Sequence, residues 1–269
     1  MPEISVIMGV YNQFNRQILE ASVDSVLNQT YKDLEFIIYD DGSAKEVTEI
    51  LEEIAKKDER IVLFGAKENH GLAFSLNACI RKAKGKYIAR MDCDDISYPE
   101  RLQAQREFLE ENPEFSFVGC NADLFDEGGV WGVRKMPERP SESDFLKYSP
   151  YIHPSVMYRA NLFTKEIAYD ESSEMLRCED YEIFMKLKSK GYSGANLQKQ
   201  LFAYREDVSA HARRTMKHRI NEAKCRYRNF KKLGILFPKG WIYVLRPIVG
   251  GIIPTRVRSR VKRKESAKQ

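Results

Sequence analysis

The sequence predicts an α/β protein whose core is a doubly wound, mostly parallel β-sheet flanked by helices. The chain of 269 residues is long enough for one large α/β domain, with or without a substantial appendage. Apolar runs rich in β-branched residues alternate with segments of helical periodicity, as in parallel strands joined by crossover helices. Polar residues follow three of these runs, at the sheet edge where such folds bind ligands.

The expected elements can be followed from the N-terminus. Residues 4–11 form a nearly continuous apolar run, which indicates a strand buried on both faces. Apolar residues at helical spacing then run from Ile18 to Leu27. The elements expected after that are a strand at 34–40, a helix through Val47 and Ile54, a strand at 61–66, a helix at 72–84 and a strand at 86–91.

An acidic stretch follows the last of these strands. The strand ends on Asp92, a polar turn holds Asp94 and Asp95, and a helix opens near Ser97. Three carboxylates so close together cannot all ionise cheaply without a cation beside them. The carboxylates supply only oxygen ligands, which favours Mg²⁺ or Mn²⁺ as the bound cation. These ions keep coordination positions open for phosphates. The stretch therefore predicts a metal that holds a diphosphate.

Helix capping is the alternative interpretation of the same stretch. Ser97 and Glu100 fit a capping box, and acids just before a helix favour its dipole without binding a ligand. Capping does not explain Asp92, which would end a buried strand with an exposed charge. On this stretch alone both interpretations stay open.

Polar groups at the ends of three strands indicate a common binding crevice. Tyr11, Asp41 and Asp92 each lie where a predicted parallel strand stops, so the fold would bring them to one edge of the sheet. Taken singly, each has a structural explanation. Tyr11 would pack on a neighbouring side chain, and Ser43 with Glu46 would form a second capping box.

Missing signals exclude several classes of protein. No Gly-x-Gly-x-x-Gly follows the first strand and no Gly-x-x-x-x-Gly-Lys-Ser/Thr occurs, which disfavours a dinucleotide-binding domain and excludes a P-loop NTPase. Five scattered cysteines without a Cys-x-x-Cys pair indicate reduced core residues. The N-terminus has no signal-peptide pattern, and no apolar segment reaches the roughly 20 residues of a membrane-spanning helix. We therefore expect a cytoplasmic protein.

The second half of the chain is less regular. The elements expected there are a helix to about residue 111, a strand at 115–120, a hairpin or loops at 121–150 and a strand-like segment after His153-Pro154. A helix is well marked at 179–190 and ends at Gly191. Its first turn holds Glu179 and Asp180. One interpretation is that both are ordinary acids of a helix first turn. The other is that Asp180 projects into the crevice as a general base.

The formal net charge of +5 conceals a strong asymmetry. Residues 1–210 hold 26 Lys+Arg against 37 Asp+Glu, whereas residues 211–269 hold 18 against 2. An acidic body with a basic tail predicts an anionic partner for the tail. Nucleic acid is not expected to be that partner, because the acidic body would repel it.

The tail is also partly apolar. Residues 211–239 are compatible with a helix, and residues 241–254 are apolar but interrupted by Arg246 and Pro247, which makes them too short and broken to cross a bilayer. Followed by a basic run, they fit a segment that lies in the interface of the inner membrane. The alternative is a helix docked on the domain, followed by a charged end.

Seven short motifs resemble those of family 2 glycosyltransferases with the GT-A fold. In chain order they are ISVIMGVYN, Gln29-Thr30, YDDGS, Asn69-His70-Gly71, IARMDCDDISYPERL, HPSVMYR and CEDYEIFMKL. Their order and spacing over residues 3–205 make the resemblance specific, whereas a lone Asp-x-Asp would be weak. It is strongest to bacterial members that build capsule, exopolysaccharide or lipopolysaccharide chains. The resemblance implies a GT-A domain at 1–210 and a basic amphipathic extension at 211–269.

The resemblance also assigns catalytic and metal-binding roles. Asp92-Cys93-Asp94 is similar to the family's Asp-x-Asp, which makes Asp94 the expected ligand of Mn²⁺ or Mg²⁺ and Asp92 a further candidate ligand. Asp180 matches the acid that serves as the base in these inverting enzymes. His211 is a candidate for the histidine that completes the metal or phosphate site in many members, although the loop around it departs from the family pattern.

Further residues are expected to bind the nucleotide. Tyr11 and Asp41 match positions that contact the base, typically uracil, and Asp92 is expected near the ribose. Asn12 stands in the same motif as Tyr11, and Asn69 stands in the motif Asn69-His70-Gly71; both are expected to contact the nucleotide as well.

The implied activity is the transfer of a sugar from a nucleotide sugar, expected to be a UDP-sugar, to a hydroxyl of a glycan or lipid-linked acceptor at the cytoplasmic face of the membrane. One alternative is a sugar nucleotidyltransferase. That class normally needs a basic glycine-rich loop after the first strand, which residues 10–13 do not supply. The other is a non-catalytic subunit that binds nucleotide sugars in a membrane complex, for which the basic tail is the main argument.

Overall fold

A single mixed β-sheet forms the centre of the molecule. The computed structural model describes residues 1–206 and 215–252. Within these ranges the strand order is β3-β2-β1-β4-β8-β6-β9-β5, with β7 paired to β6. The strands are β1 (Ile4–Val10), β2 (Leu34–Asp41), β3 (Ile61–Ala66), β4 (Tyr87–Arg90), β5 (Ile96–Ser97), β6 (Phe117–Asp126), β7 (Gly129–Arg134), β8 (Met157–Arg159) and β9 (Gly194–Arg205).

The N-terminal half of the sheet is doubly wound, as the sequence predicts. From β1 the chain passes through α1 (Arg16–Leu27), β2 and α2 (Lys45–Ala55) to β3, and then returns through α3 (Leu72–Lys82) to β4 on the other side of β1. All these pairings are parallel. The winding direction therefore reverses between β1 and β4, which is where open α/β sheets form their ligand crevice.

The second half of the sheet mixes directions. The short strand β8 pairs antiparallel with both β4 and β6, whereas β6 and β9 run parallel to each other. β6 extends to Asp126, beyond the predicted end at residue 120, and turns at Gly129 into β7. The predicted hairpin in this region is confirmed. β9 and the two-residue strand β5, which pair antiparallel, complete this side of the sheet.

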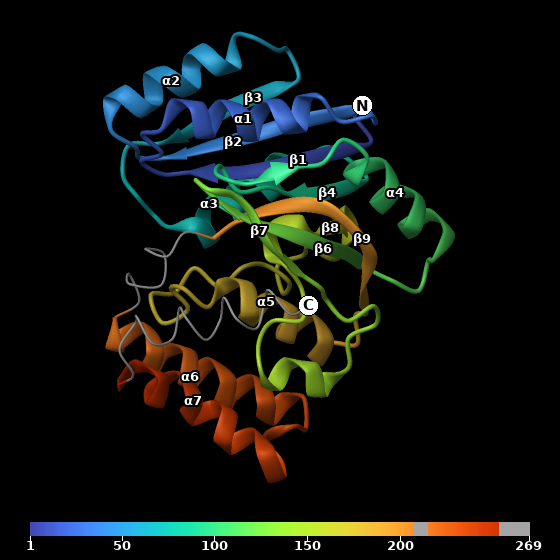
Figure 1. Cartoon of the computed structure of the whole chain (residues 1–269), viewed down its shortest axis with the longest axis vertical. Helices are drawn as coiled ribbons and strands as arrows, with labels where there is room; N and C mark the ends of the chain where they lie inside the picture. The colour runs from blue at the N-terminus through green and yellow to red at the C-terminus, as the bar shows by residue number, and fades with distance from the viewer. Residues whose placement is uncertain (207–214, 253–269) are drawn as a thin grey trace.

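Helices cover both faces of the sheet and bury two separate cores. Alternate residues of β1 face opposite sides, so Val6 and Met8 belong to one core and Ile7 to the other. The first core packs beneath α1, α2 and α4 (Arg101–Glu111). The second packs beneath α3, α5 (Glu179–Ser189), α6 (Met216–Lys232) and α7 (Trp241–Ile252). Figure 1 shows α6 and α7 below α5, at the opposite end of the molecule from α2.

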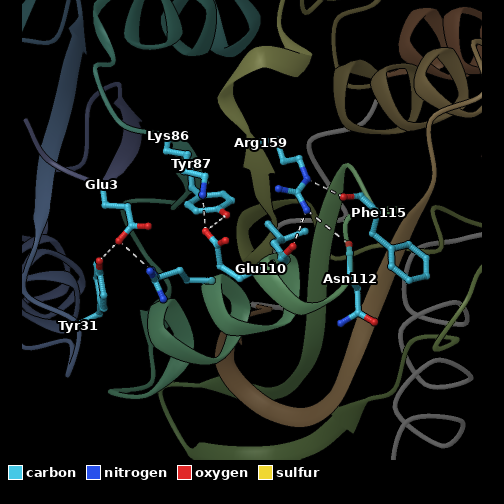
Figure 2. Close-up of polar contacts among 10 residues, drawn as sticks. Glu3, Tyr31, Lys86, Tyr87, Glu110, Asn112, Phe115 and Arg159 are labelled. Carbon is cyan, nitrogen blue, oxygen red and sulfur yellow. Dashed lines mark hydrogen bonds and ion pairs between the residues drawn. The ribbon is translucent and has the colours of Figure 1, made fainter.

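Polar contacts fix α4 and the turn after it against neighbouring parts of the chain, including β4 and β8. Arg106 donates to the carboxylate of Glu3 over 2.8 Å, and the hydroxyl of Tyr87 in β4 donates to Glu110 over 2.5 Å (Figure 2). At the C-terminal end of the helix, Arg159 of β8 donates to the carbonyl of Phe115 over 2.9 Å. These contacts hold in place the helix that follows the acidic turn.

The predicted capping box of Ser97 and Glu100 is wrong. Ser97 lies in β5, and α4 begins at Arg101 after Glu100, whose side chain caps nothing. The buried side chain of Gln29 performs this role from the end of α1: its Oε1 accepts from the backbone NH of Leu102 over 3.0 Å. Its amide nitrogen donates to the hydroxyl of Ser97 and to the carbonyl of Tyr98. A tertiary contact therefore replaces the local cap.

We expect Gln29→Ala to lower the free energy of unfolding by about 3 kcal/mol, because it leaves several buried polar groups without partners. Urea unfolding followed by circular dichroism would measure the change. Gln103→Ala is the matched control, since Gln103 is exposed on α4 and donates to its neighbour Glu107 over 2.9 Å. The control should lose less than about 0.5 kcal/mol. Equal losses in the two variants would contradict the capping role of Gln29.

The remaining predictions on the fold concern cysteines and membrane spans. Four of the five cysteines are buried, and Cys93 is partly exposed. In the described part of the chain, no helix combines the length and the apolar character required to cross a bilayer.

Candidate active site

Three carboxylates gather just beyond the end of β4. Asp92 follows this strand, and Asp94 and Asp95 lie in the turn toward β5. One oxygen from each lies within 4.8 Å of the others. Asp92 and Asp94 are partly exposed, whereas Asp95 is buried. The sequence predicts this cluster, and the structure brings its members together at the reversal point between β1 and β4.

Two buried arginines stabilise the end of β4 and the first residue of the cluster. The side chain of Arg90 is 2% exposed and forms an ion pair with Asp92. Arg101 is fully buried at the start of α4 and donates to the carbonyl of Arg90 over 3.0 Å. Sequence reasoning missed both residues, although a charged Arg90 inside an apolar strand was a signal that a buried anion lies nearby.

Arg205, at the end of β9, holds the other side of the acidic turn. Its backbone NH donates to Asp95 Oδ1 over 2.7 Å, and its Nε donates to the carbonyl of Asp94 over 3.1 Å. The other oxygen of Asp95 is buried and accepts no hydrogen bond from any described residue. A buried carboxylate oxygen without a donor, beside two further carboxylates, fits the all-oxygen ligand set of a hard divalent cation.

Burial and neighbouring charges raise the pKa of two of these carboxylates, Asp94 and Asp95. Burial, followed by the charge of Asp92, raises the pKa of Asp94 to about 6. Burial, followed by the charges of Asp92 and Asp94, raises the pKa of Asp95 well above its ordinary value. Because the folded protein holds these protons more tightly than the unfolded chain does, the metal-free protein loses stability as the pH rises from the ordinary aspartate pKa through the raised pKa of the folded state. A bound cation would offset this loss of stability.

We therefore expect Mn²⁺ to stabilise the protein more at pH 7.5 than at pH 5, because protons compete for the same oxygens at low pH. At a hundredfold excess over its dissociation constant, Mn²⁺ should raise the unfolding midpoint by about 5 °C at pH 7.5. Differential scanning fluorimetry at both pH values would measure the shifts. An equal shift at pH 5, or an undiminished shift in Asp94→Asn, would contradict binding at this cluster.

Asp41 organises the turn on the β2 side of the crevice. Its carboxylate accepts from the backbone NH groups of His70 (3.0 Å) and Gly71 (2.8 Å), and from the side chain of Asn69 (2.9 Å). Gly42 follows with a φ of +71°, and an added Cβ would lie 2.5 Å from the backbone of Glu68. The structure thus brings Asp41 and Asn69 into contact, with Asp41 buried and Asn69 exposed.

Asn12 connects the end of β1 to the start of α2. It has a φ of +51°, its NH donates to the hydroxyl of Ser43 over 3.0 Å, and its side-chain oxygen accepts from the NH of Ala44 over 2.8 Å. The predicted capping box of Ser43 and Glu46 is therefore wrong, because Ala44 precedes α2 and its NH bonds to Asn12 instead.

Tyr11 is not packed into the core. It follows β1 and is 52% exposed, so about half of its side chain is accessible to solvent. An exposed aromatic ring beside the reversal point offers a flat face to a ligand.

Asp180 lies in the first turn of α5, on the side of the second core. Burial raises the pKa of Tyr169 to about 12, and the charges of Asp180 and Asp92 act in the same direction. The hydroxyl of Tyr169 bonds to Nε2 of the buried His153 over 2.7 Å. His211, the further candidate ligand, lies outside the described residues.

Comparisons with known proteins agree with this geometry. The family model "Glycosyl transferase family 2" matches residues 5–173. The chain belongs to this family. The putative glycosyltransferase EpsE of Bacillus subtilis (strain 168) is 35% identical to it over 269 residues, covering 100% of this chain and 96% of EpsE. The O-antigen biosynthesis glycosyltransferase WbnJ of Escherichia coli is 30% identical over 229 residues, covering 82% of this family 2 chain and 85% of WbnJ.

Solved structures confirm the fold. S. aureus TarS 1–349 in complex with UDP-GlcNAc superposes with a TM-score of 0.67 at 17% identity, covering 96% of this chain and 83% of TarS. The mannosyltransferase PcManGT from Pyrobaculum calidifontis, in complex with GDP-Man and Mn²⁺, gives 0.60 at 17% identity, covering 97% and 79%. The predicted GT-A-type α/β fold is therefore confirmed, and this family 2 glycosyltransferase carries an acidic cluster of the Asp-x-Asp kind.

Proposed function

We propose that this family 2 enzyme is a metal-dependent, inverting glycosyltransferase that moves a sugar from a UDP-sugar to a hydroxyl of a glycan or lipid-linked acceptor in bacterial surface polysaccharide biosynthesis. The observation that carries the proposal is the three-carboxylate cluster of Asp92, Asp94 and Asp95 at the reversal point of the sheet. Similarity to EpsE and to WbnJ, whose name specifies O-antigen biosynthesis, supports the polysaccharide context.

The donor would lie across the carboxyl ends of β1, β2 and β4. In the proposed arrangement the exposed ring of Tyr11 contacts the base, and Asp41 shapes the adjoining turn with Asn69. Asn12 lines the entry between β1 and α2, and Asp92 lies nearest the ribose. UDP is the expected nucleotide because Tyr11 and Asp41 match family positions that contact the base, typically uracil. The fold alone does not favour one nucleotide, since the TarS structure contains UDP-GlcNAc and the PcManGT structure contains GDP-Man.

The chemistry requires a base and a way to hold a departing diphosphate. Mn²⁺ or Mg²⁺ bound by Asp94, with Asp92 and Asp95 beside it, would neutralise the negative charge that develops on the diphosphate. Asp180 accepts the proton of the acceptor hydroxyl as its oxygen forms a bond to the anomeric carbon. The bond from that carbon to the diphosphate oxygen breaks, and its electron pair leaves with the diphosphate. This single displacement inverts the anomeric configuration.

A screen of nucleotide sugars with and without Mn²⁺, scored by release of nucleoside diphosphate, would test the proposal. We expect release from a UDP-sugar only with the metal, and faster release when a hydroxyl acceptor is present. Release of pyrophosphate from a nucleoside triphosphate would instead indicate a sugar nucleotidyltransferase. Binding of donors without any turnover would indicate a non-catalytic subunit. Membership of family 2 favours the transferase over both alternatives.

A further inference from the structure

The hairpin formed by α6 and α7 has an exposed apolar face. We define this outer face by eight exposed side chains, which are Met216, Ile220, Tyr227, Phe237, Trp241, Ile242, Leu245 and Val249. Phe237 is 72% exposed, Ile242 69% and Leu245 53%. So many large apolar side chains on two adjacent helices exceed the scattered single residues that are normal on a soluble surface.

The spacing of the residues explains why the face is continuous. Trp241, Leu245 and Val249 recur every four residues on one side of α7, whereas Val244 between them is buried in the second core. On α6, Met216 and Ile220 form the same kind of stripe. Aromatic contacts join the two helices, since the ring of Trp241 lies 5.2 Å from that of Tyr227 and 5.9 Å from that of Phe237.

Exposed lysines lie among these apolar side chains. Lys224 and Lys231 continue the stripe of α6, and Lys239 lies beside Phe237. The only acid of the hairpin in residues 215–252 is Glu222, which pairs with Arg226 over 3.0 Å. In sequence, residues 253–269 then add seven Lys or Arg and one Glu. An apolar face with basic side chains around it matches the chemistry of an anionic lipid surface.

A second copy of the chain is a poorer occupant of this face. Two such faces packed together would bring the lysines of both copies close to one another, and like charges in contact oppose association. A bilayer accepts both components, because its acyl region takes the apolar side chains and its phosphates lie at the level of the lysines.

We propose that the outer face of the α6–α7 hairpin docks on the surface of an anionic lipid bilayer. The hairpin also supports the segment that leads to Asp180: Asn221 donates to the carbonyl of Ser173 over 3.3 Å, and Arg228 pairs with Glu174 over 3.0 Å. Figure 1 shows α5, which carries Asp180, directly above the hairpin. With Asp180 as the base proposed above, docking holds α5 on the membrane side of the enzyme, where a lipid-linked acceptor would be presented.

Vesicle binding of the full-length protein tests the proposal directly. The chain has two tryptophans, so Trp131→Phe leaves Trp241 as the only one. With vesicles of phosphatidylglycerol and phosphatidylcholine, we expect a blue shift of Trp241 fluorescence and quenching by brominated acyl chains. Co-sedimentation should show at least tenfold weaker binding to pure phosphatidylcholine vesicles. Equal binding to both vesicle types, or an unshifted and unquenched Trp241, would overturn the proposal.

Substitutions on the outer face provide a second test of the proposal. The double variant Ile242→Glu with Leu245→Glu should weaken binding to anionic vesicles at least tenfold. Val130→Glu is the matched control, because Val130 is 63% exposed on β7, away from the hairpin, and this variant should bind like the parent. Lys224→Glu with Lys231→Glu should also weaken binding severalfold, whereas Lys45→Glu on α2 should not.

Two results with the Ile242/Leu245 double variant would also overturn the proposal. Parent-like vesicle binding by this variant would assign the membrane contact to another surface of the protein. A dimer in light scattering that the variant abolishes, without vesicle binding by the parent, would assign the face to a second copy. Vesicle binding needs no turnover, so its failure is independent of the proposed transferase activity. Nucleoside diphosphate release by the double variant on a water-soluble acceptor should equal that of the parent.

Discussion

Asp94→Asn is expected to reduce metal-dependent release of nucleoside diphosphate by about 10³-fold or more. The substitution removes one of three clustered carboxylates, and with it the main charge that would hold a divalent cation against the departing diphosphate. A steady-state assay with Mn²⁺ titrated over several orders of magnitude would measure both the loss of kcat and the change in metal affinity.

The same variant should fold at least as well as the parent. Arg205 donates to the backbone carbonyl of Asp94, which the substitution keeps. Because the pKa of Asp94 is raised to about 6, its ionised form destabilises the metal-free protein at neutral pH, and asparagine removes that charge. The unfolding midpoint without metal should therefore stay equal or rise. Asp24→Asn, at an exposed position on α1, should match the parent in all assays. Turnover by Asp94→Asn within tenfold of the parent would contradict the metal assignment.

The parallel half of the fold was predictable because its signals are local. Each strand from β1 to β3 is an apolar run followed by a helix with one apolar side, β4 is a further apolar run, and this pattern needs no knowledge of distant residues. β9 lacks such a pattern, because Gln198, Lys199 and Gln200 interrupt it with exposed polar side chains while its partner β6 lies far away in sequence. Strand pairing across that distance depends on tertiary structure, so the local sequence pattern could not predict it.

The site shows the same division between local and distant signals. The carboxylates of Asp92 and Asp94 were evident because they are neighbours in sequence, whereas the partners that position the turn come from elsewhere. Arg205 reaches Asp95 across 110 positions, and Gln29 reaches Leu102 across 73. Both predicted capping boxes are absent for this reason, because in each case a side chain from another element accepts a hydrogen bond from the backbone at the start of the helix.

Asp180→Asn is expected to lower sugar transfer by about 10²- to 10⁴-fold while leaving donor binding within about threefold of the parent. Asparagine keeps the size of the side chain at the first turn of α5 but cannot accept the proton of the acceptor hydroxyl. The acidic cluster beyond β4 is untouched, so affinity for the donor with Mn²⁺, measured by calorimetry, should persist. A combined loss of binding and transfer would show that Asp180 supports the donor site rather than acting as the base.

The neighbouring acid provides the sharpest comparison for this assignment. Glu179 also lies in the first turn of α5, but burial, followed by the charge of Asp180, raises its pKa, and its Oε2 accepts no hydrogen bond from the described residues. Asp180, and not Glu179, matches the acid that serves as the base in the family, so Glu179→Gln should reduce transfer by less than about tenfold. If Glu179→Gln lost transfer and Asp180→Asn did not, the roles of the two acids would be reversed. If Asp180→Asn transferred sugar at the parental rate, another group would have to take the proton.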